Sequence, residues 1–459
     1  MLFAKGYEVK TNPSKGDGYM FQRKRKVFWP ILLLAIVFAA GCSGSPSAPA
    51  DQSTGPSSSP EKKDPIKIGA IFPLSGSLVL LGTESFEAAD LARKIVNEQG
   101  GVNGRPVEFI KADAPDATAA ANEANRLISK EGVKLIIGTY ASGLALAAAP
   151  VAERNGVVYY ELIASSDKLN QQGFRYVFRV NDNSTKLGTA AVDFVEEALA
   201  PRLQIEPEKL KLAVIFEDGA FGTAAAEIVK SRALQSGINL VAYENYKATS
   251  VDLSSLVLKL KEVNPDVIIA ASYVNDAVLF QKQAKQYDLN PKAFIGITAG
   301  YGLPDLAENL GKDANGIFVV EAPAMVNPEA LTEEARKLDE EFRKRWQEMK
   351  GRDPAGHAYR AFSGTYALLT QILPNAASVE DSEAIREALL KADIPEGSLP
   401  NGWGIKFLPE IDPNAGLNER SFAAIQQWQD EKLVMVWPEK LATAEIKDVP
   451  LPPWKDRNK

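Results

Sequence analysis

Histidine and cysteine are nearly absent from this chain of 459 residues, which contains one of each, His357 and Cys42. A single cysteine excludes an internal disulfide, so disulfides give no information about the compartment. His357 lies in a helical stretch among alanine and tyrosine, which favours a structural role. We therefore expect no metal site built from these residues, and no Cys-His or Ser-His-Asp nucleophile.

Other catalytic signatures are lacking as well. The glycine-containing segments "GGVNG" and "EDGAFG" do not fit the phosphate-binding loop G-x-x-x-x-G-K-[ST]. No two carboxylates stand out as an acid–base pair. The sequence therefore predicts a protein that is not an enzyme and that uses no cofactor.

The chain lacks a net positive charge, and long apolar runs are scarce. Residues 1–41 hold 7 of the 52 basic and 2 of the 59 acidic side chains, which leaves 45 and 57 in the remainder, a net charge of −12. This balance argues against nucleic acid as a partner. The one extended apolar stretch, residues 27–40, is shorter than the roughly 20 residues that cross a bilayer. We therefore do not expect the body to span a membrane.

The beginning of the chain has the pattern of an export signal. Basic residues 23–26 precede the apolar stretch, and small residues follow it. Residues 39–42, "AAGC", resemble the lipobox of bacterial lipoproteins, with alanine where that family usually has leucine. The resemblance implies that residues 1–41 are a signal peptide and that Cys42 carries a lipid such as palmitate. The alternative is a small buried cysteine, and Met20 is an alternative start.

The next segment has the composition of a tether. Residues 42–65 are almost wholly serine, proline, alanine, glycine and charged residues. Such a segment buries too little apolar surface to offset its ordering entropy. We expect a flexible link between a membrane anchor and a folded body.

Strands and helices alternate in the body. Apolar strands are expected in two series, at 66–72, 107–113, 133–139 and 157–162, and at 211–217, 238–246, 266–273 and 292–298. Apolar strands separated by helical segments predict parallel sheets that are covered on both faces. Two such series therefore predict two doubly wound α/β domains.

The last part of the chain has a different pattern. Residues 327–352 predict a long charged helix, residues 355–373 a more apolar one, and a third helix follows from Asp381. Strand-like segments then include "GIKF" and "FAAIQQWQ". Residues 441–459 contain "VPLPPW", which has no core-forming pattern, so we expect a C-terminal tail.

Several segments, in order, carry a family resemblance. They are "IKIGAIFPLSGSLVLLGTESFEAADLARKIVNEQGGVNGRPVEFIKAD", "LIIGTYASGLALAAAPVAERNGV", "GFRYVFRV", "EDGAFG" and "GWGIKF". Over roughly residues 66–440 the chain resembles the solute-binding lipoproteins of ABC importers, in the branched-chain amino acid (Leu/Ile/Val) binding protein family. The resemblance implies a type I periplasmic-binding-protein fold, with two parallel-sheet lobes joined by a hinge of several chain crossings. Lobe 1 would hold 66–181 plus 320–405, and lobe 2 would hold 182–319 plus 406–440.

The expected ligand site lies where parallel strands end. Ligands sit beyond the carboxyl ends of such strands, where helix N-termini offer free N–H groups and a positive dipole end. Tyr140, Ala141 and Ser142 lie at one such turn, and the resemblance implies that Ser142 grips a ligand carboxylate. Its alternative is a plain N-cap role. The resemblance also implies a ligand contact from the hydroxyl of Ser165 and the carbonyl of Ile163, with an ordinary polar loop as the alternative.

Lobe 2 would supply aromatic cover but no obvious partner for an ammonium. The resemblance places Phe221 and Tyr273 over the ligand, with a core role as the alternative. Thr298 stands where the amino acid binders have a carboxylate. Glu161 and Glu321 could replace it, and we expect Glu161 in particular to face an ammonium, although each could instead be exposed or paired internally. The ligand class therefore stays open between an amino acid, a small carboxylate and an amide.

The combined interpretation is a lipid-anchored extracytoplasmic receptor that captures a small polar solute. We expect a monomer that delivers its ligand, in first place a branched-chain amino acid or a relative, to the permease and ATPase subunits of an ABC importer. The alternative is a sensor that presents a small carboxylate or amide to a signalling partner. Genes for permease and ATPase subunits next to the gene for this chain would favour transport over sensing.

Overall fold

The computed structural model describes residues 64–298 and 300–457. The predicted signal peptide, Cys42 and nearly all of the predicted tether lie outside the described residues. These described residues belong to one compact unit. Within its described part, no helix is long and apolar enough to cross a membrane.

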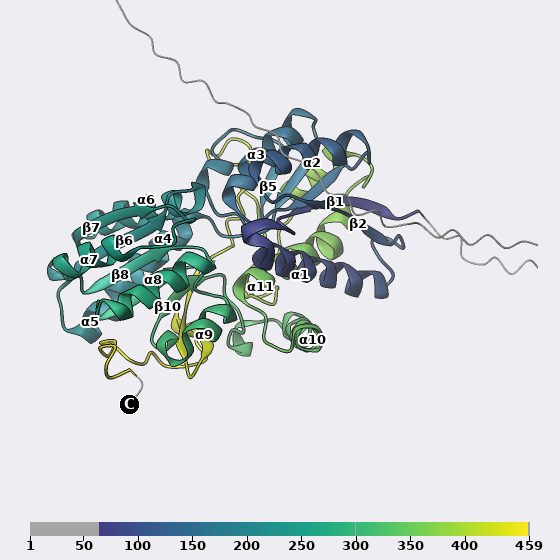
Figure 1. The fold of residues 1–459 in the computed structure, drawn as a ribbon. Coiled ribbons are helices and arrows are strands. Elements are labelled where there is room, and N and C mark those ends of the chain that lie inside the picture. The colour runs from purple at the N-terminus through teal and green to yellow at the C-terminus, as the bar shows by residue number, and fades with distance from the viewer. Residues whose placement is uncertain (1–63, 299, 458–459) are drawn as a thin grey trace, which may run out of the picture. The chain divides into compact units, whose positions relative to one another are not determined.

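The first sheet has five parallel strands, in the order β2-β1-β3-β4-β5. The strands are β1 (Ile66–Phe72), β2 (Val107–Asp113), β3 (Leu135–Gly138), β4 (Val158–Glu161) and β5 (Val177–Arg179). Figure 1 shows α2 (Ala117–Ser129) and α3 (Ser142–Arg154) on one side of this sheet, and α1 (Val79–Glu98) and α11 (Gly356–Ala367) on the other. Because helices cover both faces, β1, β3 and β4 are buried almost throughout. We call this layered unit lobe 1.

Two further helices complete lobe 1. They are α10 (Glu333–Lys350) and α12 (Ser382–Leu390). Phe342 and Trp346 of α10 are fully buried in the same core as the first sheet. The rings of Phe342 and of Phe362 in α11 stack with centroids 4.0 Å apart. The long charged helix predicted within residues 327–352 therefore packs on lobe 1 through these apolar side chains.

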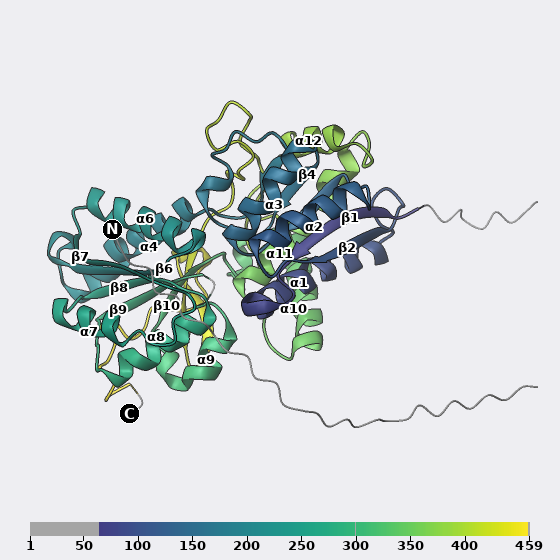
Figure 2. The same ribbon diagram turned by 45° about the horizontal axis from the view of Figure 1, so that its top comes forward.

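The second sheet has seven strands, in the order β12-β11-β10-β9-β8-β6-β7. They are β6 (Lys211–Glu217), β7 (Asn239–Tyr246), β8 (Val267–Ala271), β9 (Ala293–Ile297), β10 (Phe318–Glu321), β11 (Ala424–Gln429) and β12 (Lys432–Trp437). Figure 2 labels β6 to β10 of this sheet. Strands β6 to β10 are parallel, whereas β11 and β12 run antiparallel to their neighbours. We call this sheet and its helices lobe 2.

Alternate residues of the lobe 2 strands enter two different cores. In β8, Val267 and Ile269 pack with α4 (Ser184–Phe194) and α6 (Ala220–Gln235). Ile268 instead packs with α7 (Ser254–Val263), α8 (Val274–Gln286) and α9 (Pro304–Leu310). The short α5 (Ala200–Leu203) follows α4 through a π-helical segment. A strand that is buried on both faces reads as a continuous apolar run, which explains the sequence pattern.

The eight strands expected from the two series are confirmed as β1 to β4 and β6 to β9. The segment "GIKF" is an exception: Ile405 and Phe407 make isolated bridges and belong to no strand. β10 was not expected as a strand, and it pairs along its whole length with β9 and β11 of lobe 2. A boundary between residues 319 and 320 therefore cuts through β10.

The chain passes between the lobes three times. It leaves lobe 1 after β5, returns after β10 to reach α10, and leaves again between Phe407, which packs in the core of lobe 1, and β11. The C-terminal segment then packs on lobe 2. Leu451 and Trp454 are buried in its core, and the Trp454 indole donates to the carbonyl of Leu289 at 2.7 Å. The expectation of a tail without core residues is therefore wrong, because two separated apolar anchors in a proline-rich segment form no periodic pattern.

Candidate functional site

A small cavity of about 20 Å³ lies where strands of both sheets end. Its lining residues are Tyr140, Ala141, Ser142, Ile163, Ser165, Phe221, Tyr273, Thr298 and Arg360. Five strands, β3, β4, β6, β8 and β9, lead into the turns that carry all of these residues except Arg360. The structure thus brings together eight of the ten residues that the sequence singled out, and it adds one.

The wall from lobe 1 is the start of α3. Ala141 is the N-cap of this helix, and Ser142 is its first residue, so the plain N-cap alternative for Ser142 does not hold. The Ser142 hydroxyl instead accepts a hydrogen bond from the backbone N–H of Ser166 at 3.1 Å. The first N–H groups of a helix have no acceptor inside it, and they carry the positive end of the dipole. This wall is therefore suited to an anion such as a carboxylate.

Ser165 supports the same wall in two ways. Its backbone carbonyl accepts hydrogen bonds from Arg179 at 3.0 Å and from the backbone N–H of Ser184 at 2.7 Å. Its side chain is nearly buried and lines the cavity. Because the structural contacts use the carbonyl, the hydroxyl is available to a ligand.

The structure contradicts the expected role of Glu161. This residue ends β4, is fully buried and does not line the cavity. Its carboxylate accepts hydrogen bonds from the backbone N–H groups of Thr139, Ile163 and Ala164 at 2.8–2.9 Å and from the hydroxyl of Tyr159 at 2.8 Å. Burial raises the pKa of Glu161, and these donors partly offset the rise. Glu161 is thus paired internally, as its alternative had it, and it holds the turns instead of facing a ligand.

Aromatic side chains form the wall from lobe 2. The rings of Phe221 and Tyr273 lie with centroids 5.6 Å apart, at the starts of α6 and α8. Both helix starts already hold a protein carboxylate. Glu217 accepts from the backbone N–H groups of Gly219 and Gly222 at 2.6 Å each, and Asp276 accepts from the backbone N–H of Tyr273 at 3.2 Å. Three helices, α3, α6 and α8, begin at the cavity. Among the hydrogen bonds of the described residues, a carboxylate accepts from the start of α6 and of α8 but not from the start of α3.

Arg360 of α11 is the residue that sequence reasoning missed. Its side chain is almost fully buried, and its Nη2 atom donates to Asp182 at 3.0 Å. Its Nη1 atom lies 2.5 Å from Oε1 of Glu321, the last residue of β10. Burial lowers the pKa of Arg360, but the charges of Asp182 and Glu321 outweigh this effect and raise it. The sequence contained a sign that Arg360 is unusual, because it is the one arginine, lysine or acidic residue in the apolar helix predicted at 355–373.

Glu321 does not line the cavity either. It pairs with Arg360, and its carboxylate also accepts from its neighbour, the backbone N–H of Ala322, at 3.1 Å. Burial raises the pKa of Glu321, and the charge of Arg360 partly offsets the rise. Glu321 therefore pairs with Arg360 without lining the cavity itself.

The phenols of the cavity wall are neutral. Burial, with the charge of Glu321 adding to it, raises the pKa of Tyr140 above its ordinary value. Burial likewise raises the pKa of Tyr273, with a contribution from Glu217. Both hydroxyls therefore keep their protons and can donate hydrogen bonds.

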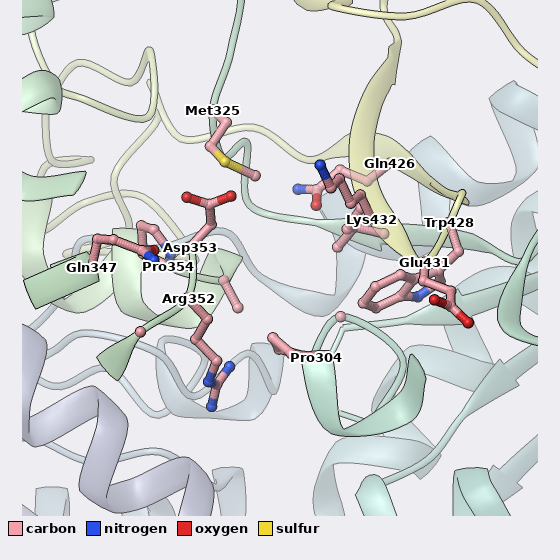
Figure 3. Close-up of a pocket in the computed structure, with 14 residues that line it drawn as sticks. Pro304, Met325, Gln347, Arg352, Asp353, Pro354, Gln426, Trp428, Glu431 and Lys432 are labelled. Carbon is pink, nitrogen blue, oxygen red and sulfur yellow. The ribbon is translucent and has the colours of Figure 1, made fainter. Parts of the chain in front are cut away.

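A larger cavity, of about 300 Å³, lies between the turn that joins α10 to α11 and the hairpin of β11 and β12. Figure 3 shows Arg352 and Asp353 on one side of it and Trp428, Glu431 and Lys432 on the other. Arg352 is engaged outside the cavity, in an ion pair with Glu84. None of the ten residues expected at the site lines this cavity, so we place the candidate site in the smaller one.

His357 lies next to the smaller cavity without lining it. Its Nε2 atom lies 3.1 Å from Oε2 of Glu84, and its ring meets that of Tyr140 edge-on at 6.2 Å. Burial raises the pKa of Glu84, but His357, Arg352 and Lys350 outweigh burial and lower it. Within the described ranges, no group of three histidine, cysteine or acidic side chains could hold a metal ion.

Comparisons with known proteins agree with this architecture. The model of the periplasmic binding protein family matches residues 65–409. A Leu/Ile/Val-binding protein homolog 7 of Brucella suis is 35% identical over 416 residues, which are 90% of this chain and 98% of that one. A homolog 8 of Brucella abortus is 36% identical over 384 residues, with 83% and 93% covered.

Solved structures show the same fold. The branched-chain amino acid transporter substrate binding protein LivJ of Streptococcus pneumoniae, in complex with isoleucine, has a TM-score of 0.68 at 21% identity, with 80% of this chain and 97% of that one covered. A leucine binding protein LivK of Thermotoga maritima has a TM-score of 0.69 at 24% identity, with 81% and 97% covered. At such identities the solved structures establish the fold alone, which is the type I periplasmic-binding-protein fold. The family model and the Brucella proteins establish the family. The chain belongs to the periplasmic binding proteins, a class of solute-binding proteins, and within them to the branched-chain amino acid binding protein family.

Proposed function

We propose that this protein is the solute receptor of an ABC importer and that it binds a small organic carboxylate between its lobes. The observation that carries the proposal is the free start of α3 at a cavity to which both lobes contribute. A carboxylate there accepts from backbone N–H groups and from the hydroxyls of Ser142 and Ser165. The phenyl ring of Phe221 and the phenol of Tyr273 cover it from lobe 2.

Branched-chain amino acids are the first ligands to test. The names of the Brucella relatives refer to leucine, isoleucine and valine, and the LivJ structure contains isoleucine. The test is a thermal-shift screen of the body from Asp64 onward, followed by calorimetry, against amino acids, small carboxylates and amides. A rise in Tm with a carboxylate ligand, but not with the matching amine, supports the proposal. A screen in which no small carboxylate binds would overturn it.

Delivery to a permease is the second part of the proposal. A receptor delivers its ligand by docking in the closed, ligand-bound form, so a strain without this chain should lose uptake of the labelled ligand. Reintroduced wild-type protein should restore uptake. Binding without any effect on uptake would separate this chain from transport.

A lipid anchor at Cys42 completes the proposal, and it rests on the sequence pattern alone. Cells grown with labelled palmitate should label the wild-type protein, whereas Cys42→Ala should stay unlabelled and unprocessed. Absence of label in the wild type would remove the anchor from the proposal and leave ligand binding untouched.

A further inference from the structure

The wall of the candidate cavity contains a cation and no carboxylate. Arg360 is the one charged residue among the nine that line it in the described structure. The other polar groups of the wall are hydroxyls and backbone atoms. A ligand that fills this cavity therefore meets a guanidinium at one place and the start of α3 at another.

Five acidic side chains that lie near this wall are already used by protein donors. Glu161 holds the turns after β3 and β4, and Glu217 holds the start of α6. Asp276 accepts from the hydroxyl of Tyr246 at 2.8 Å and from the backbone N–H of Tyr273. Asp182 and Glu321 both pair with Arg360. An ammonium in this cavity would be desolvated beside a guanidinium, which is unfavourable without a carboxylate of its own.

Arg360 itself has an unused donor. Its two Nη atoms pair with Asp182 and Glu321, whereas its Nε atom is buried and has no hydrogen-bond partner among the described residues. A buried donor that stays unpaired has a desolvation cost, so a ligand that supplies an acceptor gains by relieving it. Asp182 and Glu321 hold the guanidinium in place, and the Arg360 side chain lines the cavity.

We infer that the ligand has two acceptor ends and no ammonium: a carboxylate at the start of α3 and a second oxygen acceptor, a carbonyl or a second carboxylate, at Arg360. This inference rests on the proposed function and narrows its ligand class to 2-oxo acids and small dicarboxylates. Arg360 then acts as a specificity residue. It donates a hydrogen bond to the oxygen acceptor of a 2-oxo acid, and its positive charge repels the ammonium of the matching amino acid.

The first test uses the wild-type protein and ligands that share one carbon skeleton. Calorimetry compares leucine, 4-methyl-2-oxopentanoate and 4-methylpentanoate, with succinate and glutarate as dicarboxylates. We expect a 2-oxo acid or a dicarboxylate to bind at least about tenfold more tightly than the amino acid, as for one charge-assisted hydrogen bond. Tighter binding of leucine than of its 2-oxo analogue would overturn the inference and leave the receptor function intact. Binding of none of these carboxylates would overturn both.

The second test changes the arginine. Arg360→Lys keeps the positive charge but loses the planar fork and the Nε donor. We expect it to weaken binding of the two-acceptor ligand about tenfold more than binding of 4-methylpentanoate, which has one acceptor end. The matched control is Arg386→Lys, which alters a buried arginine of α12 that pairs with Glu383 and Glu410 away from the cavity. Equal affinities of Arg360→Lys and wild type for the two-acceptor ligand would overturn the role of Arg360, and the wild-type comparison stands even if this variant fails to fold.

Discussion

Both carboxylate oxygens of Glu161 lie 2.8 Å from the backbone nitrogen of Thr139. The last residue of β4 therefore holds the turn that follows the neighbouring β3. The same carboxylate accepts from the N–H groups of Ile163 and Ala164 in its own turn. One buried side chain thus positions both turns that carry the serines of the cavity, because strands β3 and β4 are adjacent in the sheet.

Glu161→Gln tests this positioning role. The amide lacks one of the two acceptor oxygens, so some of the N–H groups that Glu161 holds lose their partner, at about 1–3 kcal/mol of stability. Affinity should fall by the same factor for an amino acid and for its deaminated analogue, since the turns are shared by both. Calorimetry with the two ligands measures this, and an ammonium-specific loss would return Glu161 to the role of a ligand contact.

The control for this variant is Glu153→Gln. Glu153 also accepts from backbone N–H groups, those of Arg175 and Tyr176, but its contacts lie at the surface of lobe 1 and away from the cavity. We expect it to leave affinity unchanged. A similar affinity loss in both variants would mean that general loosening of lobe 1, and not the two turns, weakens binding.

The two serines of the cavity should respond differently to alanine. Ser165→Ala removes a hydroxyl whose neighbouring carbonyl makes the structural contacts, so affinity should fall about tenfold to a hundredfold with little change in Tm. Ser142→Ala also removes the acceptor of the buried Ser166 N–H, so it should lower affinity and cost about 1 kcal/mol of stability. Thermal unfolding and calorimetry on both variants check this, and unchanged affinity in Ser165→Ala would exclude its hydroxyl from the grip.

Asp276 should make the stability of lobe 2 depend on pH. Burial raises the pKa of this carboxyl to about 7 in the folded protein, whereas an unfolded aspartate titrates near about 3.9. Between these values the folded state keeps a proton that the unfolded chain has lost, so stability falls as pH rises from about 4 to 7 and then levels off. Asp276→Asn cannot ionise and should lack this component. The Tm of wild type relative to the variant should therefore decrease from pH 5 to pH 8, and parallel profiles would contradict the raised pKa.

Trp454 should anchor the C-terminal segment to lobe 2. Its ring is buried and its indole N–H donates to Leu289, so Trp454→Ala should cost about 3 kcal/mol of unfolding free energy. The exposed Leu234 of α6 offers a control, since Leu234→Ala should change stability by less than about 0.5 kcal/mol. Denaturant unfolding measures both. Equal, small effects would show that the segment contributes nothing to the core.

The sequence predicts most of this fold because the interior strands are short apolar runs between helical segments. The same logic places Ser142, Ser165 and Tyr273 at the ends of strands, and the structure brings them to one cavity. Arg360 stands out as the lone charge of an apolar helix, but its approach to the cavity was not predictable, because helical periodicity does not say which distant strand ends a helix will face. The direction of Glu161 was not predictable either, because its partners are backbone N–H groups, which leave no trace in the residue types.

The three passages between the lobes have a consequence for how such genes recombine. A chimera of two related genes joined at one breakpoint between codons 182 and 317 would take Ser142 from one parent and Arg360 from the other, although both belong to lobe 1. The cavity of the chimera would then combine the Ser142 turn of one parent with the Arg360 side of the wall from the other. Single crossovers in this architecture therefore shuffle the two ends of ligand recognition independently, whereas transplanting a whole lobe requires three matched junctions.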